Sequence, residues 1–300
     1  MRRAATRRAA LLAACLACGS AAGAPQVFDP SRSDPRAIAI ADLAMAALGG
    51  RQAWEGTRFV YFAFAVEKDG KRVAYRTHLW DRFDGHLRFE TRGKDGASVV
   101  VLMDVNSRIG DAYRLPKEAP ADGASPGPAA TTPARLEAAA AKPLLDDAYE
   151  AWINDTYWLL MPYKMKDPGV HLKYAGEETR DGQEYDLIEL TFDDVGLTPR
   201  DRYWAHINRR SHIMDRWSYV LQDDPPGGQP TIWDWKGWAR RGLILLCPEK
   251  VSMRKGATLK ILHPIMEVYD TLPDSYFKSP GPLPGDLGSR PQPAGARTGS

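Results

Sequence analysis

The strongest constraint on the fold is a series of short segments in which apolar and polar residues alternate, with Asp-Gly pairs between them. In the first half these segments are 59–66, 73–81, 87–91 and 97–104. The Asp-Gly pairs begin at Asp69, Asp84 and Asp95, and such pairs tolerate the positive φ angles of tight hairpin turns. A period of two with aromatic enrichment is typical of β-strands. The pattern predicts a meander of antiparallel hairpins.

The second half repeats this pattern. Seven further strands are predicted, at 170–177, 185–192, 202–208, 213–222, 231–240, 243–251 and 259–269. One helix is predicted from Pro35 to Gly49-Gly50, and a second at 135–153, where Pro143 should mark a boundary or a kink. Strands and helices do not alternate as a doubly wound sheet requires. We therefore predict a mainly β (α+β) fold, with about eleven strands in a curved open antiparallel sheet or barrel.

The first 24 residues have the order of an export signal. Four arginines precede an apolar stretch at 9–17, and small residues follow through Ala24. The stretch is too short to span a bilayer as a helix, which needs about 20 apolar residues. An Ala-rich helix of the folded domain is the alternative, but the basic, acid-free beginning favours export. We expect a protein of the Gram-negative envelope, periplasmic or membrane-anchored, with the outer membrane favoured.

Two cysteines inside this segment, Cys15 and Cys18, are candidates for lipidation. Leu12-Ala13-Ala14-Cys15 resembles a bacterial lipoprotein box, and Cys18 has the better-sized apolar run before it. Ordinary cleavage near Ala22 or Ala24 is the alternative, and it would discard both. Cys247 is then left without a partner and is predicted to be a small buried hydrophobe.

The remainder of the chain is predicted to be one domain, at 25–278, with a loop and helix excursion at 116–153. The Pro/Gly-rich end at 279–300 is poor in apolar residues and is predicted to be disordered. Basic and acidic residues are interspersed and the net charge is only +2, which argues against a nucleic-acid partner.

The sequence contains no recognisable catalytic or metal motif. If Asp84-Gly85 is a two-residue turn, Trp80 lies opposite Phe89, and His78 and His86 point to opposite faces, so they cannot share a metal ion. No Gly-x-Ser-x-Gly elbow, His-Glu-x-x-His helix or phosphate loop is present. We predict no enzyme activity, no cofactor and no metal, with an envelope hydrolase of converging residues as the alternative.

Several predicted strands are apolar on both faces, which a sheet with one solvated face would not show. One interpretation is that the concave face lines a cavity for an apolar ligand, such as a lipid acyl chain. The residues predicted to line it are Val60, Phe62, Phe64, Leu87, Phe89, Trp233 and Trp235. The alternative is a structural lipoprotein whose helices and sheet pack solidly, without a ligand.

Particular motifs resemble the lipoprotein-carrier superfamily typified by LolA and LolB, over roughly residues 35 to 275. The stretches that match the superfamily are Ala46-Ala47-Leu48-Gly49-Gly50 with Trp54 and the strand from Phe59. More narrowly, the segments 154–164, Asp167-Pro168-Gly169, 193–199 and Asp201-Arg202-Tyr203-Trp204 resemble a group of uncharacterised exported bacterial proteins within it. The resemblance implies an open antiparallel β-barrel or half-barrel of about eleven strands with a few helices covering its mouth, and lipid or lipoprotein acyl chains as partners. An acylated cysteine would depart from a soluble carrier and be closer to an outer-membrane acceptor.

Overall fold

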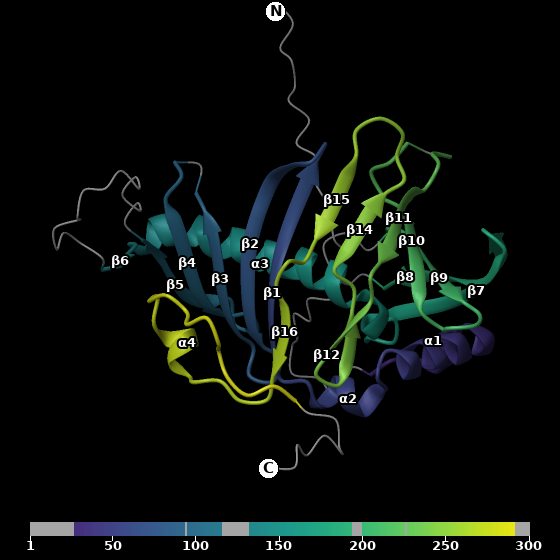
Figure 1. Cartoon of the computed structure of the whole chain (residues 1–300), viewed down its shortest axis with the longest axis horizontal. Helices are drawn as coiled ribbons and strands as arrows, with labels where there is room; N and C mark the ends of the chain where they lie inside the picture. The colour runs from purple at the N-terminus through teal and green to yellow at the C-terminus, as the bar shows by residue number, and fades with distance from the viewer. Residues whose placement is uncertain (1–26, 94, 116–131, 194–199, 226, 292–300) are drawn as a thin grey trace, which may run out of the picture.

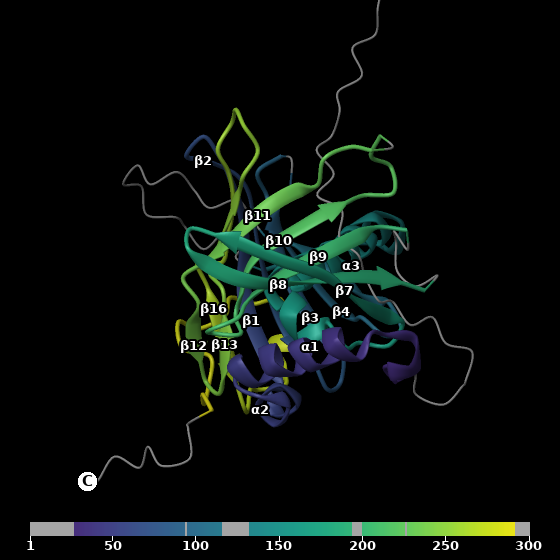
Figure 2. The same ribbon diagram turned by 90° about the vertical axis from the view of Figure 1, so that its right-hand side faces the viewer.

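The computed structural model describes residues 27–93, 95–115, 132–193, 200–225 and 227–291. In these ranges the chain forms a curved antiparallel sheet of fourteen strands with a long helix on its concave side (Figures 1 and 2). A separate pair of short strands accompanies it. The predicted open half-barrel is confirmed. The export segment, with Cys15 and Cys18, lies outside the described residues.

Two halves of the sheet meet at β1. The first half contains β1 (Phe59–Lys68), β2 (Lys71–Asp81), β3 (His86–Arg92), β4 (Ser98–Asp104), β5 (Ile109–Arg114) and β6 (Ala134–Arg135). The second contains β7 (Val170–Arg180), β8 (Gln183–Phe192), β9 (Arg202–Asn208), β10 (Met214–Val220), β11 (Thr231–Lys236), β14 (Glu249–Ser252), β15 (Leu259–Leu262) and β16 (Met266–Tyr269). Both β15 and β16 pair with β1, so the sheet is continuous from β6 at one edge to β7 at the other.

Sixteen strands are present in the described ranges, more than the eleven expected. The pattern predicted one strand over 231–240, one over 243–251 and one over 259–269, but each is broken in two. Gly237, with φ of 78°, divides β11 from β12 (Ala239–Arg241), whereas Pro248 and Pro264 divide β13 (Ile244–Leu246) from β14 and β15 from β16. Proline has no N–H for the ladder and therefore interrupts it. The strands β5 and β6 were missed.

The helix α3 (Ala138–Leu160) fills the concave side because of where it starts and ends. It follows β6 at one edge of the sheet and, through the short η2 turn (Met161–Lys164), leads to β7 at the opposite edge. The chain must therefore cross the whole sheet, and 23 helical residues extend about 35 Å. In Figure 1, α3 crosses behind the strands from the β5–β6 side towards β7. The predicted end at residue 153 was too early, and Pro143 lies within the helix rather than at its boundary.

The first helix, α1 (Pro35–Ala47), packs against β7 and η2 and begins as predicted. The side chain of Asp34 accepts a hydrogen bond from Arg36 N, which caps the helix. At its end, Gly49 has φ of 121°, and a Cβ there would lie 2.3 Å from the Leu243 carbonyl oxygen. Only glycine fits this close approach. A short helix, α2 (Arg51–Gly56), then leads into β1.

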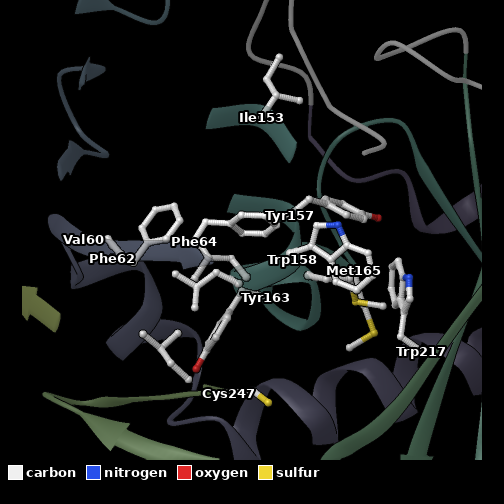
Figure 3. Close-up of a cluster of buried hydrophobic side chains, with 14 of the residues drawn as sticks. Val60, Phe62, Phe64, Ile153, Tyr157, Trp158, Tyr163, Met165, Trp217 and Cys247 are labelled. Atoms are coloured by element: carbon white, nitrogen blue, oxygen red, sulfur yellow. The ribbon is translucent and has the colours of Figure 1, made fainter. Parts of the chain in front are cut away.

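One large hydrophobic cluster joins the concave face of the sheet to α1 and α3. Figure 3 shows Phe62 and Phe64 on one side of the cluster and Trp217 on the other, with Tyr157 and Trp158 of α3 between them. Cys247 is fully buried in the same cluster. Among the described residues, no helix has the length and apolar character needed to cross a membrane.

Part of the predicted disordered tail is ordered, which corrects the sequence analysis. Residues 279–291 follow the short helix α4 (Ser275–Lys278) along the outer face of the first half of the sheet. Arg88 donates to the carbonyl oxygens of Ser279 (2.7 Å) and Gly281 (2.6 Å), and Leu287 is buried beside Phe59. The backbone of Ser289 also forms a bridge with Thr271, and Arg290 pairs with Glu267 at 3.1 Å. Composition failed here because long-range contacts hold the segment. Residues 292–300 lie outside the described ranges.

Candidate ligand pocket

A large pocket lies between the middle of α3 and strands β2 to β5, on the concave side, and has a volume of about 720 Å³. Its apolar wall is formed by Phe89, Val99, Val101, Leu144 and Ala151. Polar and charged side chains form the rest of the lining: Arg76, Thr91, Arg92, Asp95, Arg114, Asp147, Glu150 and Asn154. The pocket is therefore amphipathic.

Strand register explains how residues far apart in sequence reach this pocket. Arg76 lies opposite Thr91, Thr91 opposite Val99, and Val99 opposite Arg114, so one row crosses four strands. Directly opposite residues in a sheet point to the same face. The opposite wall of the pocket, facing this row of the sheet, is formed by residues of α3: Leu144, Asp147, Glu150, Ala151 and Asn154.

A buried ionic cluster fixes α3 to the pocket wall. Both oxygens of the Asp155 carboxylate accept from the Arg76 guanidinium, with a distance of 2.6 Å from Nη2 to Oδ1. His78 Nε2 lies 2.7 Å from Oδ2, and Asn154 Nδ2 donates to Oδ1 at 2.8 Å. Asp155 and His78 have no exposed surface, and the His78 ring stacks on Phe62. The cluster therefore orients both Arg76 and Asn154 at the pocket.

The protonation states in this cluster follow from burial and charge. Burial alone would raise the pKa of Asp155, but the charge and hydrogen bonds of Arg76 outweigh it and hold that pKa below its ordinary value. Burial lowers the pKa of His78, and its hydrogen bond to Asp155 offsets this only in part. His78 is therefore neutral near pH 7, and its Nε2–H donates to the Asp155 carboxylate. Its Nδ1 atom has no hydrogen-bond partner among the described residues.

All seven residues predicted to line a cavity are buried on the concave face, in the large cluster. Of these, Phe89 lines the large pocket. Trp235 lines a second space of only about 10 Å³, beside Trp158 and Trp217. The others pack within the cluster, and a ligand-lining role for them stays a prediction. Arg76, Asn154 and Leu144 were missed because neither the strand register nor the path of α3 is visible in the sequence.

Lys250 is a fully buried lysine on the same concave face. Its ammonium donates to the Cys247 carbonyl oxygen at 2.6 Å and lies 4.5 Å from the centre of the Trp235 ring. Burial lowers its pKa to about 8. The charged form is thus disfavoured in the folded protein, because few groups replace its hydration.

This burial predicts a measurable pH dependence. Between pH 8 and about 10.5 the folded protein holds Lys250 neutral while the unfolded chain is still protonated, so stability rises with pH in that window. The unfolding free energy of wild type should increase relative to Lys250→Met by up to roughly 3 kcal/mol across it. Urea titrations of both proteins at several pH values measure the difference. A difference that does not change with pH would contradict the prediction.

Two further clusters carry polar chemistry, both away from the large pocket. Asp81, Asp84 and His86 have ligand atoms within 4.8 Å of one another, but both carboxylates already pair with the guanidinium of Arg58. We assign no metal to this group.

The second cluster, on the outer face, has the order of a catalytic triad. His206 lies 2.5 Å from Glu178 through Nδ1 and 3.1 Å from Ser218 Oγ through Nε2. Ser218 is only 5% exposed, and these three residues line none of the three pockets described for this part of the chain. A nucleophile needs room for substrate beside it. We therefore interpret the cluster as a polar network across β7, β9 and β10.

Searches with the whole sequence find no matching family model and no matching curated protein. Solved structures do show likeness. A LolA superfamily protein from Nitrosomonas europaea is 12% identical, covers 80% of this chain and 96% of its own, and gives a TM-score of 0.43. A DUF1329 family protein from Desulfovibrio piger is 18% identical over 82% and 98%, with a TM-score of 0.40.

A third similar structure is the lipoprotein LppX of Mycobacterium tuberculosis, 13% identical over 78% of this chain and 97% of its own, with a TM-score of 0.28. The similar structures thus include the LolA superfamily, which the sequence motifs resemble. At such low identity the likeness concerns the fold alone.

Proposed function

We propose that this chain is a non-enzymatic protein of the bacterial cell envelope that binds the acyl chain of a lipid or lipoprotein. The observation that carries the proposal is the pocket of about 720 Å³ between α3 and β2 to β5, with its apolar wall and charged rim. Its volume falls in the range of about 300–1,000 Å³ that is usual for small-molecule sites. The export signal predicted at the N-terminus supplies the location.

The chemistry of the lining fits an amphiphile better than a wholly apolar or wholly polar ligand. Each buried methylene contributes about 0.8 kcal/mol, so about ten of them contribute roughly 8 kcal/mol before the costs of association. Val99, Val101 and Leu144 supply apolar surface for such a chain, and Thr91 and Arg92 supply hydrogen-bond donors for its polar end.

The proposed site is displaced from the one predicted by the sequence. Trp233, Val60 and their neighbours lie where α3 covers the sheet, so a ligand would meet them only if α3 moved away. The middle of α3, from Leu144 to Asn154, leaves space over β3 to β5. An acyl chain would therefore bind over the first half of the sheet.

Filling this pocket should weaken ligand binding strongly. In Ala151→Trp an indole occupies the space where the acyl chain would lie, and we expect affinity for a fluorescent fatty acid to fall by a factor of about 10 or more. Fluorescence titration measures this. Native mass spectrometry of protein purified from an envelope fraction should also show a bound lipid in wild type and none in the variant.

The matched control is Ala139→Trp, which places the same side chain on an exposed position of the same helix that does not line the pocket. It should bind like wild type. If wild type takes up no fatty acid and carries no lipid, the proposal is wrong. Equal uptake by Ala151→Trp and wild type would show that the acyl chain binds elsewhere.

A further inference from the structure

Two hairpin tips lie together at one end of the sheet. The β1–β2 turn at Asp69-Gly70 contacts the β14–β15 loop at 253–258 through two hydrogen bonds. Asp69 N donates to the Thr258 carbonyl oxygen, and Thr258 N donates to Asp69 Oδ1, each at 2.8 Å. Both figures show the tips side by side at the upper end of the sheet (Figures 1 and 2). We call residues 67–75 and 253–258 the tip surface.

The tip surface is basic. It contains five exposed basic residues and two acidic ones, Glu67 and Asp69, an excess of three positive charges. The basic residues are Lys68, Lys71, Arg72, Arg254 and Lys255. Glu67 pairs only loosely with Arg72, at 3.9 Å, and the Asp69 carboxylate accepts from a backbone N–H. Most of the positive charge therefore faces solvent.

Exposed apolar side chains are concentrated on the same surface. Val73 is 62% exposed, Met253 49% and Tyr75 40%, and they are three of the seven large hydrophobic residues exposed in the described part of the chain. The Arg72 guanidinium lies 5.2 Å from the centre of the Tyr75 ring. Apolar side chains surrounded by basic ones are characteristic of surfaces that rest in the interface of an anionic membrane.

We propose that the tip surface docks on an anionic lipid bilayer. Each Lys or Arg close to such a surface strengthens binding about fivefold, so a few of them are sufficient for reversible docking. Val73 and Met253 would enter the boundary between headgroups and acyl chains, and Tyr75 would lie at headgroup level, where tyrosine is enriched.

The docking surface and the ligand pocket share one end of the sheet. Successive turns of a meander alternate between ends, so the β3–β4 turn, which includes Gly93 and residues 95–97, lies at the same end as the β1–β2 turn. Gly93 and Asp95 of that turn line the pocket. Arg76 in the pocket wall is five residues along β2 from Lys71, a distance of about 17 Å. Docking would turn the pocket towards the bilayer, where an acyl chain could enter it. This advantage rests on the proposed function, whereas docking itself does not.

Vesicle sedimentation tests the docking. The exported full chain with Cys15→Ser and Cys18→Ser is used, so that no acyl anchor contributes, with vesicles of phosphatidylcholine alone or mixed with phosphatidylglycerol. We expect binding only to the mixed vesicles, weakening as salt is added. The variant Lys71→Gln/Arg254→Gln/Lys255→Gln should bind about 100-fold more weakly. Val73→Ser/Met253→Ser should also weaken binding, with little change in its dependence on salt.

The control removes the same charge elsewhere, in Arg51→Gln/Lys142→Gln/Lys278→Gln, whose residues are exposed on α2, α3 and α4. It should bind within about threefold of wild type. Equal binding by the tip and control variants, or no preference for phosphatidylglycerol, would overturn the proposal. Fatty-acid uptake in solution separates the two proposals, because tip variants should retain it even if docking is lost.

Discussion

Replacing Asp155 by alanine should lower the unfolding free energy by about 3–5 kcal/mol, among the largest effects expected for one side chain of this protein. The substitution leaves two groups without their shared acceptor: the imidazole of His78, which is fully buried, and the guanidinium of Arg76, whose side chain is 24% exposed. Removing one member of a buried ion pair costs more than the pair itself contributes, because the remaining charge is uncompensated.

Denaturant unfolding followed by tryptophan fluorescence measures this loss. Asp147→Ala is the matched control, because Asp147 is an exposed carboxylate on the same helix, and it should change stability by no more than about 0.5 kcal/mol. The double variant Arg76→Met/Asp155→Leu should recover much of the loss, since it removes both charges together. A loss below about 1 kcal/mol in Asp155→Ala would contradict a structural role for the cluster.

The pH dependence of the same comparison has a defined sign. Since the folded pKa of Asp155 is lowered, its contribution to stability is fully present above about pH 4 and is lost as the pH falls through the folded value. The difference in unfolding free energy between wild type and Asp155→Ala should therefore be largest near neutral pH and should decrease in acid.

Replacing Trp158 by alanine should also cost about 3–5 kcal/mol. Trp158 projects from α3 into the packed part of the concave face, where its ring lies 5.0 Å from that of Trp233 and 6.3 Å from that of Tyr219. It is only 5% exposed, and the space beside it is only about 10 Å³, so the truncation leaves a cavity that its neighbours cannot fill.

Calorimetry and denaturant unfolding measure this effect. Trp204→Ala is the control, because Trp204 lies on the outer face of β9, where the lost indole leaves no enclosed cavity, and its loss should be clearly smaller. Similar losses in the two variants would indicate that the concave face is not tightly packed around α3. Fatty-acid uptake by Trp158→Ala should persist, because Trp158 does not line the large pocket.

The turn between β2 and β3 shows how far the alternating pattern could be trusted. A two-residue turn at Asp84-Gly85 would place Trp80 opposite Phe89, but the structure places Trp80 opposite Leu87 and His78 opposite Phe89. The register is shifted by two residues, and a shift by two leaves every side chain on its predicted face. His78 and His86 therefore do point to opposite faces, although the turn was predicted wrongly.

The local sequence by itself determined the strands of the meander, the first helix and the residues of the concave face. Alternation, Asp-Gly turns and a capped helix start act over a few residues. These signals were sufficient to predict a curved open sheet or barrel and the apolar concave face that buries Phe62, Phe89 and Trp233. Local signals fail where proline or glycine divides a strand, and where long-range contacts hold an apolar-poor segment such as 279–291.

The tertiary structure alone decided how the concave space is used. The edge strands β6 and β7 are joined through α3, so the helix must cross the concave side of the sheet. It packs tightly against the second half of the sheet and leaves the pocket over β3 to β5. Arg76 and Asp155 are 79 residues apart, and no spacing in the sequence indicates that they pair. Contacts at such separations depend on sheet order and register, which are set by the packing of the whole chain.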